Sequence, residues 1–256
     1  MLTLTEKLNL AGRVAKTAGD NLLSKHGFRV EQKAMNDFVT EVDRETEQFI
    51  RNELLAQCPE DSFLGEEYGV TDGGEGCWIV DPIDGTTNFI RGIPLYTVSI
   101  GYRVRGELLL GCVYCPRLGE LYMAESGKGA TLNGESIHVS QIADHRNALV
   151  AISFSHRNMD DRKRMMKLLS TLTELNDMRR TGSAAFDLCQ VACGRTEGFI
   201  ELRLNIYDIA AGIVILKEAG GTVTGWPNEP DCTETGNVLA TNALITEYLT
   251  ATIKAI

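Results

Sequence analysis

The chain has 256 residues, 43% of them hydrophobic and 23% charged, a composition typical of a folded globular protein whose core needs no disulfide staples. Its 25 lysines and arginines are outnumbered by 35 aspartates and glutamates, and the net charge of -10 disfavours direct binding to nucleic acid. No stretch reaches the roughly 18 apolar residues of a membrane span, and the first residues lack the basic-then-apolar order of a signal peptide. We therefore expect a cytoplasmic protein that does not bind a membrane.

Seven cysteines, an odd number, are scattered along the sequence, which fits reduced intracellular thiols better than a disulfide framework. Cys112 and Cys115 form a CxxC pattern inside an apolar run. Because no second CxxC and no histidine pair accompanies them, buried strand cysteines are favoured over a zinc or redox site.

Two long helices are predicted at the start of the chain. Apolar residues at alternating spacings of four and three favour a helix over about 4–22, with Thr3 and Glu6 as a capping box and Gly27 as a left-handed C-cap. A second helix is predicted from about Thr40 to Gln57, ending before Pro59.

From about residue 77 the pattern changes to short β-type runs separated by turn residues, with Arg105-Gly106 and Asn133-Gly134 at hairpin positions. We expect these strands to pair antiparallel and to pack against the two helices. The predicted strands are Trp78–Val80, Thr97–Val104, Glu107–Tyr114, Glu120–Glu125 and Ser136–Val139.

After about residue 142 strands and helices alternate. The predicted elements are strand Leu149–Phe154, helix Met159–Leu175, helix Ala184–Cys193, strand Gly198–Leu202 and helix Ile209–Ala219. The sequence therefore predicts an α/β (α+β) protein. We divide it into an N-terminal half, 1–141, and a C-terminal half, 142–256, with a broad shared interface.

The most informative run is Asp-Pro-Ile-Asp-Gly-Thr-Thr-Asn-Phe at 81–89, at the end of a predicted buried strand. Proline cannot extend the strand ladder, so Asp81 and Asp84 can converge and the Ile83 carbonyl is free to act as a ligand. Gly85 permits close backbone approach, and the amides that follow it could receive a phosphate. The alternative is a strand-to-loop turn with two solvated aspartates.

Three further acids stand in distinctive surroundings. Asp43 lies at the start of the second predicted helix, Glu66 lies in Gly-Glu-Glu after an apolar pair, and Asp208 opens a helix rich in small residues. Each also has a structural explanation: Asp43 and Asp208 could serve as acids favoured by a helix dipole, and Glu66 could be an ordinary loop charge.

Taken together, these segments resemble the inositol monophosphatase family, Mg²⁺-dependent, lithium-sensitive phosphatases of small phosphorylated molecules, over nearly the full length. The resemblance implies a layered αβαβα sandwich, a homodimer, and hydrolysis by an activated water without a covalent intermediate. It rests on five segments: 36–43, 65–67, 81–89, 180–184 and 207–212. One departure is Tyr207, where the family usually has tryptophan.

The resemblance assigns roles to individual residues. It implies two or three Mg²⁺ ions, held by Glu66, Asp81, the Ile83 carbonyl, Asp84 and Asp208. It implies that Thr86, oriented by Asp43 and Glu66, helps to activate the attacking water. It further matches Lys33 to a lysine near the metals, and it implies a pocket for a polyol monophosphate lined by Asp84, Gly85, Thr86, Gly182, Ser183, Ala184, Glu201 and Asp208.

Elementary electrostatics supports the metal expectation independently. Two carboxylates about 4 Å apart repel by roughly 4 kcal/mol at an effective dielectric constant near 20, so several can stay ionised together only beside a cation. An all-oxygen ligand set without histidine or cysteine favours Mg²⁺ or Mn²⁺ over zinc.

Several alternatives remain open. Relatives with the same metal residues cleave fructose 1,6-bisphosphate, histidinol phosphate or 3′-phosphoadenosine 5′-phosphate, and some bacterial relatives act as partner-binding proteins in transcription complexes. Lys33 could be an ordinary solvated lysine, Ala184 a core residue, and Glu201 a strand-edge acid. The basic residues of the helix predicted over 159–175 are interpreted as a solvated face.

Overall fold

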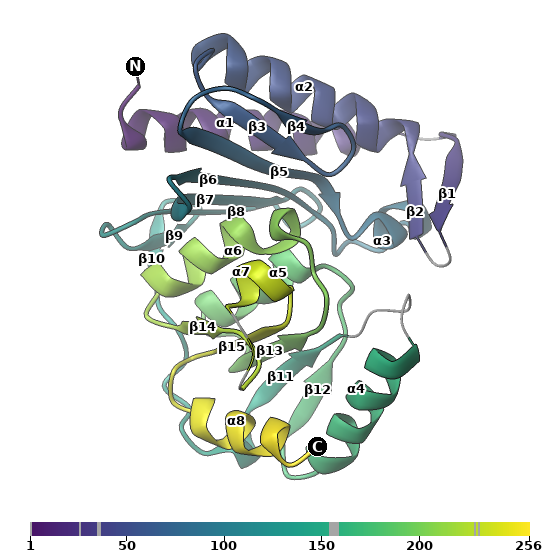
Figure 1. Cartoon of the computed structure of the whole chain (residues 1–256), viewed down its shortest axis with the longest axis vertical. Coiled ribbons are helices and arrows are strands. Elements are labelled where there is room, and N and C mark those ends of the chain that lie inside the picture. Colours follow the sequence, from purple (N-terminus) through teal and green to yellow (C-terminus); the bar gives the residue numbers. More distant parts are fainter. Residues whose placement is uncertain (1, 26, 35–36, 154–158, 228, 230) are drawn as a thin grey trace.

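The structure, a computed structural model, describes the chain apart from residues 1, 26, 35–36, 154–158, 228 and 230, and it does not describe the side chains of residues 32–39. Five layers alternate between helices and sheets down the long axis (Figure 1). Among the described residues, no helix combines the length and the apolar character needed to cross a bilayer.

The first layer holds the two N-terminal helices. Helix α1 (Leu4–Leu22) begins at the predicted capping box of Thr3 and Glu6, and α2 (Glu41–Gln57) begins at a second capping box made by Thr40 and Asp43. A small hairpin of β1 (Val30–Ala34) and β2 (Asp37–Thr40) connects them.

The second layer is an eight-stranded sheet in the order β10-β9-β8-β7-β6-β5-β3-β4. All the pairs from β5 to β10 are antiparallel, as predicted, while β3 adds one parallel pair with β5. The strands are β3 (Ser62–Gly65), β4 (Gly69–Thr71), β5 (Gly76–Asp84), β6 (Thr97–Val104), β7 (Glu107–Cys115), β8 (Glu120–Glu125), β9 (Ala130–Leu132) and β10 (Glu135–Ile137).

The third layer consists of α5 (Ala184–Ala192) and α6 (Ile206–Glu218), flanked by the short α7 (Cys232–Thr235), and it lies between the two sheets (Figure 1). Small residues allow α6 to approach the first sheet closely: a Cβ on Gly111 would lie 2.2 Å from the Ala211 carbonyl oxygen, and a Cβ on Gly101 2.9 Å from Ala210. Helix α6, which the sequence shows to be rich in small residues, therefore packs closely against the first sheet.

The fourth layer is a mixed five-stranded sheet in the order β12-β11-β13-β15-β14. The fifth contains α4 (Met159–Thr171) and α8 (Thr246–Lys254), which pack beneath it. The strands are β11 (Leu149–Ile152), β12 (Asp177–Arg179), β13 (Gly198–Glu201), β14 (Thr222–Thr224) and β15 (Val238–Thr241), and a 3₁₀ turn (His145–Asn147) precedes β11.

Several boundaries and one cap differ from the sequence-based predictions. Among the strands, β5 runs from Gly76 to Asp84 rather than from Trp78 to Val80, and β10 is Glu135–Ile137 rather than Ser136–Val139. Helix α1 ends at Leu22 with Leu23 as its C-cap, so Gly27, although its φ is +70°, does not cap it. Helix α6 starts at Ile206 rather than Ile209, because Asn205 and Asp208 form a capping box that adds a turn. Helix α4 ends at Thr171 rather than Leu175.

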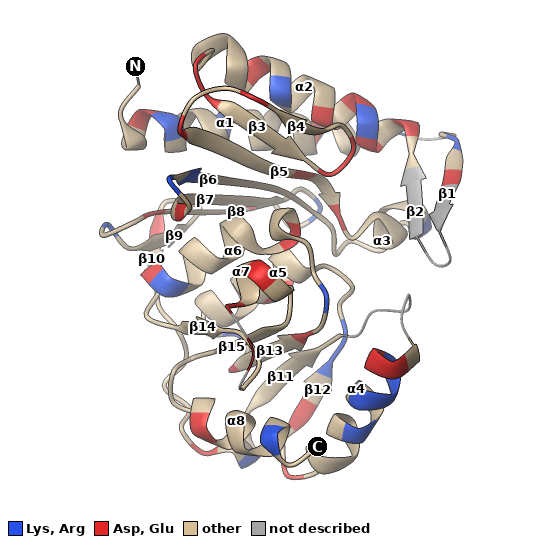
Figure 2. Cartoon of the chain, viewed as in Figure 1, with Lys and Arg blue, Asp and Glu red and all other residues tan. Residues whose placement is uncertain are grey.

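The structure agrees with the sequence-based interpretations of the cysteines and of the basic residues of α4. All seven cysteines are free, and Cys112 and Cys115 are buried on β7. Basic residues run along α4 (Figure 2), and Arg162, Lys163 and Lys167 are exposed. Arg164 is half-buried, pairs with Glu229 at 3.0 Å and covers the Trp226 ring at 4.2 Å.

Candidate active site

The site begins with an irregularity at the end of β5. Asp81 lies opposite Ser99 on β6 and Asp84 lies opposite Thr97, so three steps along β5 match two along its partner. Residues three apart on a regular strand point to opposite faces, whereas one extra residue brings both to the same side. The charge of Asp84 accordingly acts on Asp81. The register shift between Asp81 and Asp84 thus turns both carboxylates to one side of the strand, where the sequence predicts that they converge.

Two more carboxylates act on Asp81 from other elements. Glu66 follows β3, whose parallel pairing with β5 matches Gly65 to Val80, so Glu66 emerges beside Asp81. Asp208 lies in the first turn of α6, where its Oδ2 accepts a hydrogen bond from the Asn205 amide at 2.6 Å. Burial, and then the charges of Glu66, Asp84 and Asp208, raise the pKa of Asp81 well above its ordinary value. Asp81 is 2% exposed.

Asp84 joins the first sheet to the N-terminus of α5. Its Oδ2 accepts hydrogen bonds from the Ser183 hydroxyl at 2.6 Å and the Ala185 amide at 2.7 Å, and its Oδ1 accepts one from the Ala184 amide at 3.3 Å. Burial raises the pKa of Asp84, and these bonds lower it. A carboxylate at a helix N-terminus is favoured both by free amides and by the helix dipole.

Thr86 begins α3 (Thr86–Arg91) and lies between two acceptors. Its Oγ1 is 3.0 Å from the Ile83 carbonyl oxygen and 3.3 Å from Asp43 Oδ1. The other oxygen of Asp43 accepts the amide and hydroxyl hydrogens of Thr40. Burial raises the pKa of Asp43 to about 6, although the hydrogen bonds from Thr40 oppose this shift.

Two glycines line the space beside these acids. Gly85 has φ +92°, and an added Cβ would lie 3.2 Å from the Gly182 carbonyl oxygen and 3.3 Å from Ser183 Cβ. Gly182, at φ +89°, faces Asn88, whose Nδ2 donates to the Thr181 carbonyl at 2.8 Å. The backbone of the loop before α5 thus closes against the turn after β5.

Glu201 ends β13, on the second sheet. Burial raises its pKa to about 8, a hydrogen bond from Ser153 lowers it, and the charges of Asp187 and Asp84 raise it further. Asp187 on α5 is buried, burial raises its pKa to about 8, and its Oδ1 has no hydrogen-bond partner among the described residues. A second acidic pair therefore lies next to the first cluster.

The chemistry of the donor set fits a hard divalent cation. Among the described residues, no three histidine, cysteine, aspartate or glutamate side chains lie close enough together to hold a metal ion. Asp81 Oδ1 instead accepts the Ile83 amide at 2.9 Å, and Asp84 faces α5. Carboxylates that raise one another's pKa values gain from a cation between them, and oxygen donors select magnesium or manganese.

Sequence reasoning identified most of these side chains but missed three. Asn88 lies inside the motif at 81–89, yet only the fold shows it bridging two loops. Asp187 is the one charged residue of α5, whose other residues are apolar apart from Gln190, and this isolated charge is the sequence signal that could have identified it. Glu47 on α2 is fully buried and accepts two backbone amides of the turn after β3. The side chain of Lys33 lies outside the described residues.

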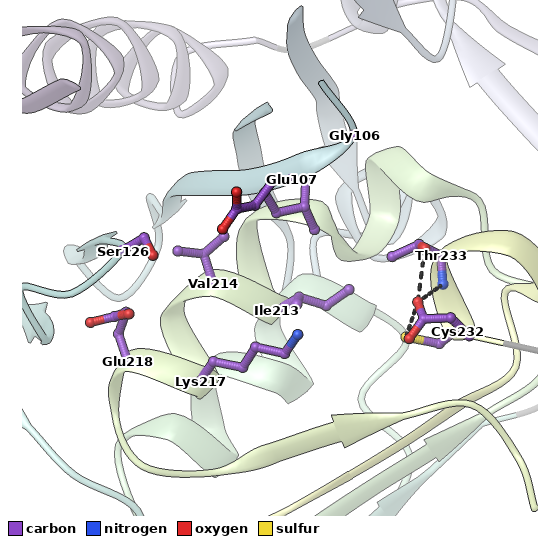
Figure 3. Close-up of a pocket in the computed structure, with 11 residues that line it drawn as sticks. Gly106, Glu107, Ser126, Ile213, Val214, Lys217, Glu218, Cys232 and Thr233 are labelled. Carbon is purple, nitrogen blue, oxygen red and sulfur yellow. Dashed lines mark hydrogen bonds between the residues drawn. The ribbon is translucent and has the colours of Figure 1, made fainter. Parts of the chain in front are cut away.

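A separate pocket of about 320 Å³ is lined by the β6–β7 turn, the second half of α6 and residues 231–233 at α7 (Figure 3). Its apolar lining includes Leu108, Ile213 and Val214. Two of its acids already have partners: Glu218 accepts the amides at 127 and 129, and Asp231 accepts the amide and hydroxyl of Thr233. Those carboxylates stabilise turns.

Comparison with known proteins gives a consistent assignment. Residues 4–256 match the Inositol monophosphatase family. The chain is 41% identical over 242 residues to Nus factor SuhB of Vibrio cholerae, covering 92% of this chain and 91% of that one. It is 36% identical over 254 residues to Inositol-1-monophosphatase of Mesorhizobium japonicum, covering 96% of each.

A solved structure shows the same fold. The crystal structure of extragenic suppressor protein suhB from Bartonella henselae superposes with a TM-score of 0.92 at 36% identity, covering 96% of this chain and 97% of that one. The layered α/β architecture predicted from the sequence is thereby confirmed. The chain belongs to the inositol monophosphatase family, a family of phosphatases.

Proposed function

We propose that this protein is a divalent-cation-dependent phosphomonoesterase that hydrolyses a small phosphorylated polyol, with inositol 1-phosphate as the first candidate. One observation carries the proposal: Asp84 from the same strand, Glu66 from the end of β3 and Asp208 from the start of α6 all act on the buried Asp81. Such a concentration of acids is unfavourable for folding alone, and it suits a site that holds cations.

The residues proposed to hold two or three Mg²⁺ ions are the carboxylates of Glu66, Asp81, Asp84 and Asp208, together with the Ile83 carbonyl; Mn²⁺ would suit the same donors. When bound, such ions supply charge neutralisation and polarise the phosphate oxygens. Asp84 holds α5 against the site, so its carboxylate also fixes the pocket wall.

Thr86 is proposed to orient the attacking water together with Asp43 and Glu66. The Thr86 hydroxyl can donate to Ile83 or Asp43 and has lone pairs left to accept a hydrogen bond from water. Once ionised, Asp43 favours the donation toward itself, because a charged acceptor binds a hydroxyl more strongly than a neutral one. This relay would help to remove a proton from the water during attack.

The substrate pocket is proposed to comprise Gly85, Thr86, Gly182, Ser183, Ala184 and Glu201, along with Asp84 and Asp208. The amides that follow Gly85 suit a phosphate, and the Glu201 carboxylate suits the hydroxyl groups of a polyol. Lys33 is proposed as an additional basic group near the metals.

The test is phosphate release from a panel of phosphomonoesters with Mg²⁺, with and without lithium. The proposal expects turnover of inositol 1-phosphate that EDTA abolishes and lithium inhibits, with Asp84→Asn lowering kcat by at least about 10²-fold. Preference for fructose 1,6-bisphosphate, histidinol phosphate or 3′-phosphoadenosine 5′-phosphate would redirect the substrate assignment. Full turnover by Asp84→Asn would overturn the mechanism.

A second candidate is a partner-binding role on the same fold, favoured by the name Nus factor SuhB of the relative from Vibrio cholerae. Wild-type and Asp84→Asn proteins should then capture the same partner, because binding does not need turnover. We also propose that the protein is a cytoplasmic homodimer and that 1–141 and 142–256 are its two units; light scattering tests the dimer.

A further inference from the structure

Glu47 is a buried acid that the catalytic scheme above does not use. It lies on α2, is 0% exposed, and its carboxylate faces the turn that follows β3. Its Oε2 accepts the Glu67 amide at 2.7 Å and its Oε1 accepts the Tyr68 amide at 2.9 Å. Both oxygens of one carboxyl group therefore hold consecutive backbone amides, which fixes the turn against α2.

The strand end is shaped around this carboxylate. A Cβ on Gly65 would lie 2.2 Å from Glu47 Oε1 and 2.3 Å from its Cδ, so any larger residue would displace the acid. On its other side, Glu66 donates its amide to the Val80 carbonyl at 3.3 Å. The backbone around Glu66 is thus held at two points: its own amide is bonded to β5, and the next two amides are bonded to Glu47.

Helix α2 carries a second contact to the site one turn earlier. Asp43 and Glu47 are four residues apart, so they lie on the same face of the helix. Asp43 accepts from Thr86, and Glu47 accepts from the turn that carries Glu66. One rigid helix therefore sets both parts of the site relative to each other.

We propose that Glu47 is a positioning residue that holds the Glu66 turn against Asp81 and thereby sets the affinity of the acidic cluster for a divalent cation. The inference rests on the proposed function, because it assumes that Glu66 is a cation ligand. Support for a ligand by its neighbours typically changes metal affinity by about 10-fold or more.

The test compares Glu47→Gln with Glu53→Gln, a matched change at an exposed position of the same helix. In Glu47→Gln one oxygen becomes an NH₂ group that cannot accept an amide hydrogen. Mn²⁺ binding to the metal-free proteins is measured by calorimetry, thermal unfolding is followed in EDTA, and phosphate release is titrated with Mg²⁺.

The expected result for Glu47→Gln is an Mn²⁺ dissociation constant raised about 10-fold, a matching shift of the Mg²⁺ activation curve, and an unchanged KM at saturating Mg²⁺. Glu53→Gln should match the wild type. Gly65→Ala, which displaces the same carboxylate, should lose the same Mn²⁺ affinity. If Glu47→Gln does not fold, Gly65→Ala tests the role of Glu47 in its place.

A folded Glu47→Gln or Gly65→Ala protein that binds Mn²⁺ as tightly as wild type would overturn the inference, even if its melting temperature falls. Failure of the proposed function looks different: the wild type would release no phosphate from any ester of the panel, while the Mn²⁺ measurement would still decide the role of Glu47.

Discussion

The Ser183 hydroxyl lies 2.6 Å from Asp84 Oδ2, and this hydrogen bond links the first sheet to the helix layer beneath it. The same hydroxyl accepts the Phe186 amide at 3.3 Å and so also caps α5. One side chain therefore couples the start of the helix to an acid of the candidate site, and the bond is buried on both sides.

Ser183→Ala should weaken both stability and catalysis. Loss of a buried hydrogen bond to a charged group costs about 1.5–3 kcal/mol, and loss of an N-cap about 1 kcal/mol. We expect a lower free energy of unfolding by roughly this amount and a reduced kcat, measured by urea denaturation and phosphate release. Ser62→Ala, which removes a hydroxyl bonded to the Gly74 carbonyl near the surface, is the control. Equal losses in both variants would contradict the assignment.

Thr86→Val tests whether catalysis depends on the hydroxyl group or on the shape of the side chain. Valine keeps the volume but cannot accept from water or donate to Asp43, so kcat should fall about 10²-fold, the lower range for a lost acid-base group. Thr86→Ser restores the hydroxyl and should recover most of the rate. Melting temperatures of the two variants are compared with wild type. A Thr86→Val protein with wild-type kcat would exclude the proposed relay.

The parts of the site that the sequence predicted share one property: they lie within short continuous motifs. The run at 81–89 carries its own turn chemistry, and the capping residues of α2 and α6 place Asp43 and Asp208 at helix starts. The missed parts depend on tertiary contacts. Strand β3 is only four residues long, which is too short for a periodic signal. The sequence of α2 does not distinguish Glu47 from an exposed helix acid, because its burial depends on the turn after β3.

Asp187→Asn should change how stability depends on pH. Burial raises the pKa of Asp187 from 3.8 to about 8, so its contribution to folding is fully present below about pH 4 and is lost as pH rises toward 8. Asparagine does not titrate. In EDTA the free energy of unfolding of the variant should therefore fall less steeply with pH than that of wild type, with a difference in slope of up to about 1.4 kcal/mol per pH unit.

The measurement is urea denaturation at several pH values, with Asp72→Asn as the control because Asp72 is exposed. That variant should follow the wild-type curve. If the free energy of unfolding of Asp187→Asn ran parallel to wild type from pH 4 to 8, the buried carboxyl of Asp187 would not hold its proton as described.

Gly85→Ala and Gly92→Ala form a pair that separates backbone strain from crowding in the pocket. Both glycines have positive φ, +92° and +70°, where alanine costs about 1–2 kcal/mol. A Cβ at 92 would meet nothing within 4 Å, whereas one at 85 would press on the Leu95 and Gly182 carbonyls at 3.1 and 3.2 Å. We therefore expect both variants to lose stability but only Gly85→Ala to raise KM, because it pushes the loop before α5 away from Asp84. A KM raised equally in both would show that crowding at Gly182 does not shape the pocket.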